Sequence, residues 1–217
     1  MPERANLLQH LYREIDARVG GDRVLRVGID GVDGAGKTTL ADELAERVSF
    51  PAIRASVDSF HHPRAVRHAR GRDSPEGFYR DSFDLETLMR ELLDPLSPGG
   101  SGTYRTAVFD HVSDRPVASE PGVVLPPAVL LFDGIFLHRP ELRGYWDYSI
   151  FLDVDSDESV RRCVARSGRS DVSLDPADPV HRRYVQGQAL YLAECRPMEC
   201  AAIVVDNRDV AAPFIAA

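Results

Sequence analysis

The chain contains the stretch Gly31-Val32-Asp33-Gly34-Ala35-Gly36-Lys37-Thr38. It matches the phosphate-binding pattern of a glycine, any four residues, a second glycine, a lysine, and then serine or threonine. Before it, residues 24–29 form a short apolar run rich in β-branched side chains, which predicts a strand. After it, Leu40, Leu44 and Val48 recur at helical spacing, which predicts a helix. A glycine-rich loop between a strand and a helix turns backbone N–H groups and the positive end of the helix toward a polyphosphate. The stretch therefore predicts a site for nucleotide phosphates.

Lys37 is the only lysine among the 26 lysine and arginine residues of the chain. A chain that otherwise uses arginine has a compact ammonium here, at a place that a planar guanidinium would not fit. We predict that Lys37 reaches the β- and γ-phosphates and that the Thr38 hydroxyl is a ligand of Mg²⁺. The predicted nucleotide contacts are Gly31, Asp33, Gly34, Ala35, Gly36, Lys37, Thr38 and Thr39.

The composition is ordinary for a globular protein and argues against several other classes. With 217 residues, 43% of them hydrophobic and 28% charged, the chain is predicted to form one domain over residues 1–217. A net charge of −8 argues against binding to a nucleic-acid backbone. The N-terminus lacks a continuous apolar core, so we predict neither a signal peptide nor a membrane partner.

Three cysteines, Cys163, Cys195 and Cys200, are odd in number and lack metal-ligand spacing. This pattern indicates reduced thiols and a cytoplasmic location. The sequence leaves open whether the chain forms a homo-oligomer.

Apolar segments alternate with amphipathic ones along most of the chain. The predicted strands are 24–29, 52–57, 128–132, 149–154 and 202–205, and the predicted helices are 7–19, 38–48, 84–93, 155–166 and a long helix through Tyr184 and Tyr191. Alternation of this kind predicts a three-layer α/β P-loop NTPase fold with a five-stranded, mainly parallel sheet. Residues 61–125 are predicted to be an excursion on the acceptor side, with two short strands at 103–110 and 117–125. Residues 166–183 are predicted to be a lid.

Two carboxylates follow predicted strands. Asp58 comes after 52–57, and Asp133 ends the buried run 128–132. The carboxyl ends of parallel strands share one edge of the sheet, where ligands bind, so both are expected beside the phosphate loop. Asp133 is the expected anionic partner of a metal held by Thr38. For Asp58 the alternative is a turn or capping role.

Basic residues cluster in two places. His61, His62 and His68 lack metal-ligand spacing and are interpreted as solvated or substrate-side residues. Arginines also gather at the end of the predicted helix 155–166, at positions 161, 162, 166 and 169. Such residues can simply complement the helix dipole. Because the polar segment 167–179 follows, the sharper hypothesis is a mobile flap that carries arginines over transferring phosphates.

In their order along the chain, these motifs resemble those of the uridine kinase branch of the P-loop kinases, which is related to phosphoribulokinase. The resemblance covers most of the chain: the phosphate loop, Asp58-Ser59-Phe60, Asp81-Ser82-Phe83-Asp84, Val108-Phe109-Asp110, Leu131-Phe132-Asp133-Gly134-Ile135, Arg161-Arg162 and Val205-Asp206-Asn207.

The resemblance implies a role for several residues. Asp58 would act as base toward the acceptor hydroxyl, and Asp81 would contact a sugar. The lid arginines that would stabilise the transferred phosphoryl group are Arg162, Arg166 and Arg169. By the same resemblance, Tyr79, Phe109 and Asp114 fall on the substrate side.

Three positions depart from the uridine kinase pattern. Phe109 stands where uridine kinases have Tyr, Asp114 where they have a base-reading His, and Asp133 where they have Glu. Phe109 cannot donate a hydrogen bond, and an ionised Asp114 can only accept one. We therefore expect uridine to be a poor acceptor. Asp114 either accepts from an amino group of another acceptor or lies on a hairpin turn facing water.

Together the residues predict an ATP- and Mg²⁺-dependent kinase that phosphorylates a hydroxyl group of a small metabolite, with a nucleoside as the first candidate. A non-nucleoside alcohol (a sugar, a sugar phosphate or a pantothenate-like molecule) and a nucleotide-binding regulator without kinase activity are the alternatives. A GTP-dependent switch is disfavoured, because a guanine-reading Asn-Lys-x-Asp segment would need a second lysine.

Overall fold

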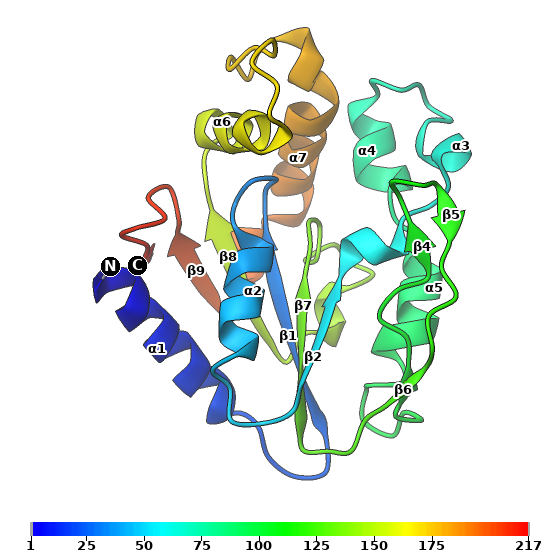
Figure 1. The fold of residues 1–217 in the computed structure, drawn as a ribbon, viewed down its shortest axis with the longest axis vertical. Coiled ribbons are helices and arrows are strands. Elements are labelled where there is room, and N and C mark those ends of the chain that lie inside the picture. Colours follow the sequence, from blue (N-terminus) through cyan, green and yellow to red (C-terminus); the bar gives the residue numbers. More distant parts are fainter. Residues whose placement is uncertain (1, 217) are drawn as a thin grey trace.

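The computed structural model describes residues 2–216 and is built on a six-stranded sheet in the order β10-β9-β8-β1-β7-β2 (Figure 1). Its strands are β1 (Val24–Gly31), β2 (Ala52–Ser56), β7 (Ala128–Asp133), β8 (Tyr148–Asp153), β9 (Ile203–Asp206) and β10 (Phe214–Ile215). The first five are parallel, as predicted, and β10 is antiparallel to β9. This sixth strand was not predicted, because two exposed residues carry no periodic signal.

Helices cover both faces of the sheet, which confirms the three-layer α/β fold. Their bounds are α1 (Pro2–Asp16), α2 (Lys37–Ala45), α3 (Arg64–Arg67), α4 (Pro75–Asp81), α5 (Leu85–Leu88), α6 (Ser156–Ser167), α7 (Arg182–Cys195) and α8 (Pro197–Cys200). Short helical turns lie at η1 (Val57–Phe60), η2 (Met89–Leu93), η3 (Arg143–Tyr145) and η4 (Pro179–His181). None of these helices is long and apolar enough to cross a membrane.

Alternate residues of the central strands pack into two separate apolar cores, one on each face of the sheet. In β7, Val129 and Leu131 pack with α1 and α2, whereas Leu130 and Phe132 pack with α4, α5 and α7. Both sets are fully buried. A strand with two buried faces reads as one continuous apolar run, which is why 128–132 was recognisable in the sequence.

The acceptor-side excursion differs in detail from the prediction. Residues 61–77, which showed no period, contain α3 and the start of α4. The two predicted strands are reduced to two-residue pairs: β3 (Thr103–Tyr104) pairs with β6 (Gly122–Val123), and β4 (Phe109–Asp110) pairs with β5 (Arg115–Pro116). The predicted helix 84–93 is α5 followed by the π-helical turn η2.

Candidate active site

The phosphate loop lies between β1 and α2 at the carboxyl edge of the sheet, as its flanking sequence predicted (Figure 1). Gly36 caps α2 with a φ of 92°, and Gly34 has a φ of 71°. L-residues with a side chain rarely adopt such angles. At Gly34 a Cβ atom would also lie 2.9 Å from the Ser159 carbonyl oxygen, so only glycine fits this turn.

A cavity of about 130 Å³ opens over this loop, and it brings most of the predicted site residues together. The predicted residues that line it are Asp33, Gly34, Gly36, Lys37, Thr38, Thr39, Asp58, Asp133 and Arg166. Ser56, Gly134 and Ile135 also line it, and they were not predicted as site residues. Gly31 and Ala35 belong to the loop but do not line the cavity: both are buried, and the Ala35 N–H donates to the Val32 carbonyl.

The Thr38 hydroxyl and the Asp133 carboxylate meet on one side of the cavity, with 2.7 Å between Thr38 Oγ1 and Asp133 Oδ2. Hydroxyl and carboxylate oxygens are the hard ligands that Mg²⁺ prefers. Within residues 2–216, no cluster of three His, Cys, Asp or Glu residues could cage a metal. The hydroxyl and carboxylate oxygens that are present fit Mg²⁺, which proteins usually bind through one or two carboxylates together with phosphates and water.

Arg54 was not predicted as a site residue, yet its Nη2 donates to Asp133 Oδ1 at 2.9 Å. It lies on β2 between Ile53 and Ala55, whose side chains pack in the core on the other face of the strand. The only feature of the sequence that could have pointed to Arg54 is its position as a cation within an apolar predicted strand.

Asp58 faces the same cavity from η1, directly after β2. Burial raises the pKa of this carboxyl group, and the positive charge of Lys37 opposes the shift. A carboxylate with a raised pKa is better suited to accept a proton from a hydroxyl group. Lys37 donates from Nζ to the Val32 carbonyl at 2.7 Å, which holds its ammonium beside the loop.

Polar side chains hold the phosphate loop from behind. The Asp33 N–H donates to Gln188 Oε1 at 2.6 Å, and Ser159 Oγ donates to the Asp33 carbonyl at 2.7 Å. Asn207 Nδ2 donates to the Ala35 carbonyl at 2.7 Å. None of these supports could be assigned from the sequence, because each joins segments far apart along the chain.

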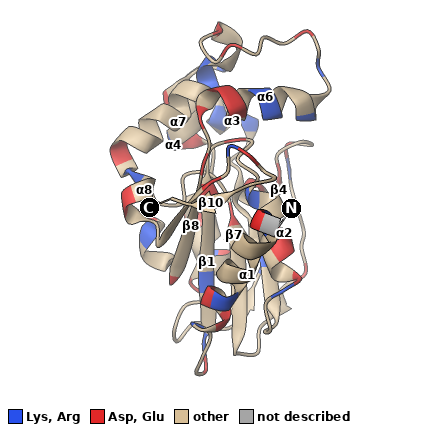
Figure 2. Cartoon of the chain, turned by 90° about the vertical axis from the view of Figure 1, so that its left-hand side faces the viewer, with Lys and Arg blue, Asp and Glu red and all other residues tan. Residues whose placement is uncertain are grey.

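The three predicted lid arginines occupy different environments. Arg162 donates to the carbonyls of Gly34 and Asn207 at 3.2 and 2.8 Å, so it braces the back of the loop instead of facing the cavity. Arg169 is exposed and pairs with Asp171. Arg166 alone of the three lines the cavity, from the basic helix α6 (Figure 2).

Two of the predicted substrate-side residues, Tyr79 and Asp114, are engaged within the protein. Tyr79 is buried in the core, and its hydroxyl lies 3.1 Å from Cys195 Sγ, so it does not face the cavity. Asp114 is on the turn between β4 and β5, with a φ of 58°. Its Oδ1 accepts from the Arg64 N–H and from Arg67. Asp114 therefore lies on the hairpin turn, but its carboxylate holds α3 against the hairpin instead of facing water.

The other two substrate-side positions are also engaged within the protein. Phe109 is buried on β4, with 8% of its surface exposed. Asp81 accepts a hydrogen bond from Arg70 Nε at 2.8 Å, which ties the end of α4 to the segment before it. In this arrangement Asp81 would have to exchange Arg70 for a substrate hydroxyl.

Three aromatic rings pack against one another beside η1. The ring of His61 stacks on His111 at 4.7 Å between centroids and tilts against Phe83 at 4.5 Å. His61 Nδ1 lies 2.9 Å from the Asp58 carbonyl oxygen, so this nitrogen carries the proton. Burial lowers the pKa of His61 to about 4, so its ring is neutral at neutral pH.

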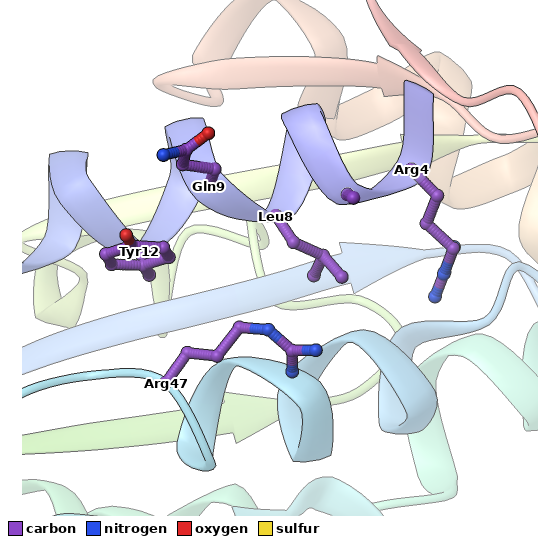
Figure 3. Close-up of a pocket in the computed structure, with 6 residues that line it drawn as sticks. Arg4, Leu8, Gln9, Tyr12 and Arg47 are labelled. Atoms are coloured by element: carbon purple, nitrogen blue, oxygen red, sulfur yellow. The ribbon is translucent and has the colours of Figure 1, made fainter. Parts of the chain in front are cut away.

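A larger hollow of about 380 Å³ lies on another face, between α1 and the end of α2. Figure 3 shows Leu8 and Tyr12 pointing from α1 toward this hollow, with Arg47 on its other side. It contains no carboxylate or glycine-rich loop and does not resemble a site of catalysis.

Comparisons with known proteins give a family match and similar sequences. The sequence model of the family described as phosphoribulokinase / uridine kinase matches residues 26–170. A uridine kinase of Chlamydia pneumoniae is 28% identical over 175 residues, which cover 76% of this chain and 78% of that protein. A uridine kinase of Ligilactobacillus salivarius is 25% identical over 176 residues, which cover 76% of this chain and 81% of that protein.

A solved structure has the same fold. The structure of a possible uridine kinase from Bacillus stearothermophilus superposes with a TM-score of 0.71 and 21% identity, over 92% of this chain and 97% of that one.

Proposed function

Because the chain belongs to the phosphoribulokinase / uridine kinase family, we propose that its cavity transfers the γ-phosphoryl group of ATP to a hydroxyl group of a nucleoside. The chain is an ATP-dependent P-loop kinase. We infer its acceptor and the roles of individual residues from the site.

One observation carries the proposal: Lys37 of the phosphate loop and Asp58 of η1 line the same cavity. Phosphoryl transfer needs little covalent help from a protein, so catalysis depends on positioning and on charge stabilisation. Lys37 and the loop N–H groups would bind the phosphates, and Asp58 would orient the acceptor hydroxyl and take its proton. Arg166 would stabilise the negative charge that develops on the transferred group.

Mg²⁺ would neutralise charge on the phosphates when bound, and Thr38 and Asp133 are the residues on this side of the cavity that suit it. Both present oxygen atoms, and these residues are already joined by a hydrogen bond. They would fix where the phosphates sit relative to Lys37.

The half-buried rings of His61 and His111 support a nucleoside as acceptor, because a planar base can stack on aromatic side chains beside Asp58. The relatives named uridine kinase support the same class. A non-nucleoside alcohol is the second candidate. Phe109 is buried without a polar group, and Asp114 is bound to Arg67, so neither is free to read the edge of a base.

The test is ADP release, measured in a coupled assay with a panel of acceptors. The panel contains pyrimidine and purine nucleosides, simple sugars, a sugar phosphate and pantothenate. We expect a nucleoside other than uridine to give the highest kcat/KM, at or above the ~10⁴ M⁻¹s⁻¹ that is usual for true substrates. A sugar or pantothenate as best acceptor would replace the nucleoside with the second candidate, and uridine as best acceptor would refute our argument from Phe109 and Asp114.

A further inference from the structure

Four side chains form a ring beside the phosphate loop: hydrogen bonds join them in series, and the backbone of α2 closes the ring. Thr38 Oγ1 donates to Asp133 Oδ2 at 2.7 Å, and Arg54 Nη2 donates to Asp133 Oδ1 at 2.9 Å. Arg54 Nε in turn donates to Asp42 Oδ1 at 2.9 Å. Asp42 and Thr38 are four residues apart on α2 and therefore lie on one face of that helix. The ring ties α2 to β2 and β7.

The guanidinium of Arg54 is fixed by a further contact. Its Nη1 donates to the Leu131 carbonyl at 2.6 Å, on the neighbouring strand β7. Leu131 is the residue that pairs with Arg54 in the register of β2 and β7. Three separate N–H directions of one planar group are thus engaged, and only arginine offers such a fork.

Both oxygens of Asp133 are occupied in this arrangement. The side chain is only 3% exposed, and Arg54 supplies the positive charge that a buried carboxylate requires. The other oxygen accepts the proton of Thr38. Because that proton points toward Asp133, the lone pairs of Thr38 Oγ1 are directed elsewhere and stay available to a cation.

We propose that Arg54 is a positioning residue for the metal-nucleotide complex, an inference that rests on the function proposed above. Arg54 holds Asp133, and Asp133 orients the hydroxyl of Thr38. Asp133 thus orients Thr38, a residue that suits the metal, while its own Oδ1 is held by Arg54. Two substitutions remove the fork in different ways: Arg54→Met removes the charge, and Arg54→Lys keeps a charge but can engage only part of the ring.

The experiment measures binding of a fluorescent, non-hydrolysable ATP analogue in Mg²⁺ and in EDTA. We expect both Arg54 variants to bind the analogue about 10-fold more weakly than the wild type in Mg²⁺, because losing a residue that supports a metal ligand costs 10–100-fold in metal affinity. In EDTA their affinities should equal that of the wild type. The matched control is Arg47→Met, which removes an exposed cation from the turn after α2. It should behave as the wild type in both solutions.

Each result supports or overturns the proposal. If Mg²⁺ strengthens binding equally in the wild type and in Arg54→Lys, Arg54 has no positioning role, although the proposed kinase function stands. If Mg²⁺ does not strengthen binding to the wild type, the magnesium site of the proposed function is wrong. Arg54→Met leaves the buried Asp133 unpaired and could fail to fold, which melting in EDTA would reveal. Arg54→Lys, which keeps a cation beside Asp133, then decides alone.

Discussion

At the scale of single residues, the site depends on two opposite charges that share one small cavity. Lys37 lies on the loop side, and Asp58 lies on the acceptor side at the end of β2. Each one is attracted by the other, while burial disfavours the ionised form of Asp58. Substitutions here should change the rate of phosphoryl transfer more than the stability of the fold.

Lys37→Ala should lower kcat/KM by about 10²- to 10³-fold, the effect of losing one preorganised group that stabilises charge in the transition state. Lys37→Arg should also be impaired, because the planar fork is wider than an ammonium. Steady-state kinetics and a urea denaturation curve on each variant measure the two effects separately. Turnover close to the wild-type rate in Lys37→Ala would contradict the proposed role.

The pH dependence of kcat/KM should report Asp58. A base works only when it is deprotonated, so the rate falls as the pH drops through the pKa of Asp58. Since that pKa is raised, the acid limb should lie above the value of about 3.9 that is normal for Asp. Asp58→Asn should lose most of its activity at every pH.

The control is Asp110→Asn, which changes a carboxylate on the β4–β5 hairpin that accepts a hydrogen bond from Ser113. This variant should leave the acid limb of the pH profile in place. If the acid limb of the pH profile stays at the same pH in Asp58→Asn, a group other than Asp58 causes that limb.

At the scale of secondary-structure elements, α6 and α7 connect the phosphate loop to the segment 168–178 between them. Ser159 of α6 and Gln188 of α7 both bind the backbone of Asp33. The intervening segment holds itself only by local bonds, such as those from Arg169 to Asp171 and from His181 to the Ser173 carbonyl. Segments with few buried contacts open most readily.

We predict that residues 167–179 exchange their amide hydrogens quickly in the free protein and slowly once the ATP analogue and an acceptor are bound. Ordering would follow if Arg166 and Arg169 approach the phosphates. Mass-spectrometric hydrogen exchange measures this segment directly, and α1 provides an internal reference that should not change. Slow exchange without ligands, and no change on adding them, would mean that the segment is not a lid.

At the scale of the whole molecule, a buried polar cluster joins the strand before the phosphate loop to distant segments. Asp30 is fully buried, and it accepts from His138 Nδ1 at 2.7 Å and from the hydroxyl of Tyr191. Its other oxygen accepts from the Gly31 N–H at 2.7 Å. His138 also lies 3.1 Å from Ser149 Oγ. The cluster thereby links β1, β8 and α7 behind the loop.

Tyr191→Phe should destabilise the protein by about 1–3 kcal/mol. The reason is that the buried backbone N–H of His138 donates to the Tyr191 hydroxyl at 3.0 Å and would lose this partner. The midpoint of urea denaturation measures this change. Tyr184→Phe, on the same helix with a side chain 48% exposed, is the matched control and should shift the midpoint little. Equal midpoints for the two variants would show that the cluster adds nothing to stability.

Much of the fold and the centre of the site could be predicted from the sequence, because their signals are local. The phosphate loop is one contiguous stretch, and Asp58 and Asp133 each follow an apolar strand directly. Parallel strands place their carboxyl ends at one edge, so knowing the strands was enough to bring these residues together.

Other features were decided only by the tertiary structure, since they depend on which distant segments pack together. Arg54 and Asp133 are 79 residues apart, and the Asp33 N–H finds Gln188 across 155 residues. Neither pair has a spacing that a sequence pattern could reveal. The same reason explains why Arg162 donates to carbonyls behind the loop and why Asp114 pairs with Arg67. A charged side chain takes the partners that folding brings within reach, and the sequence alone does not specify which partners those are.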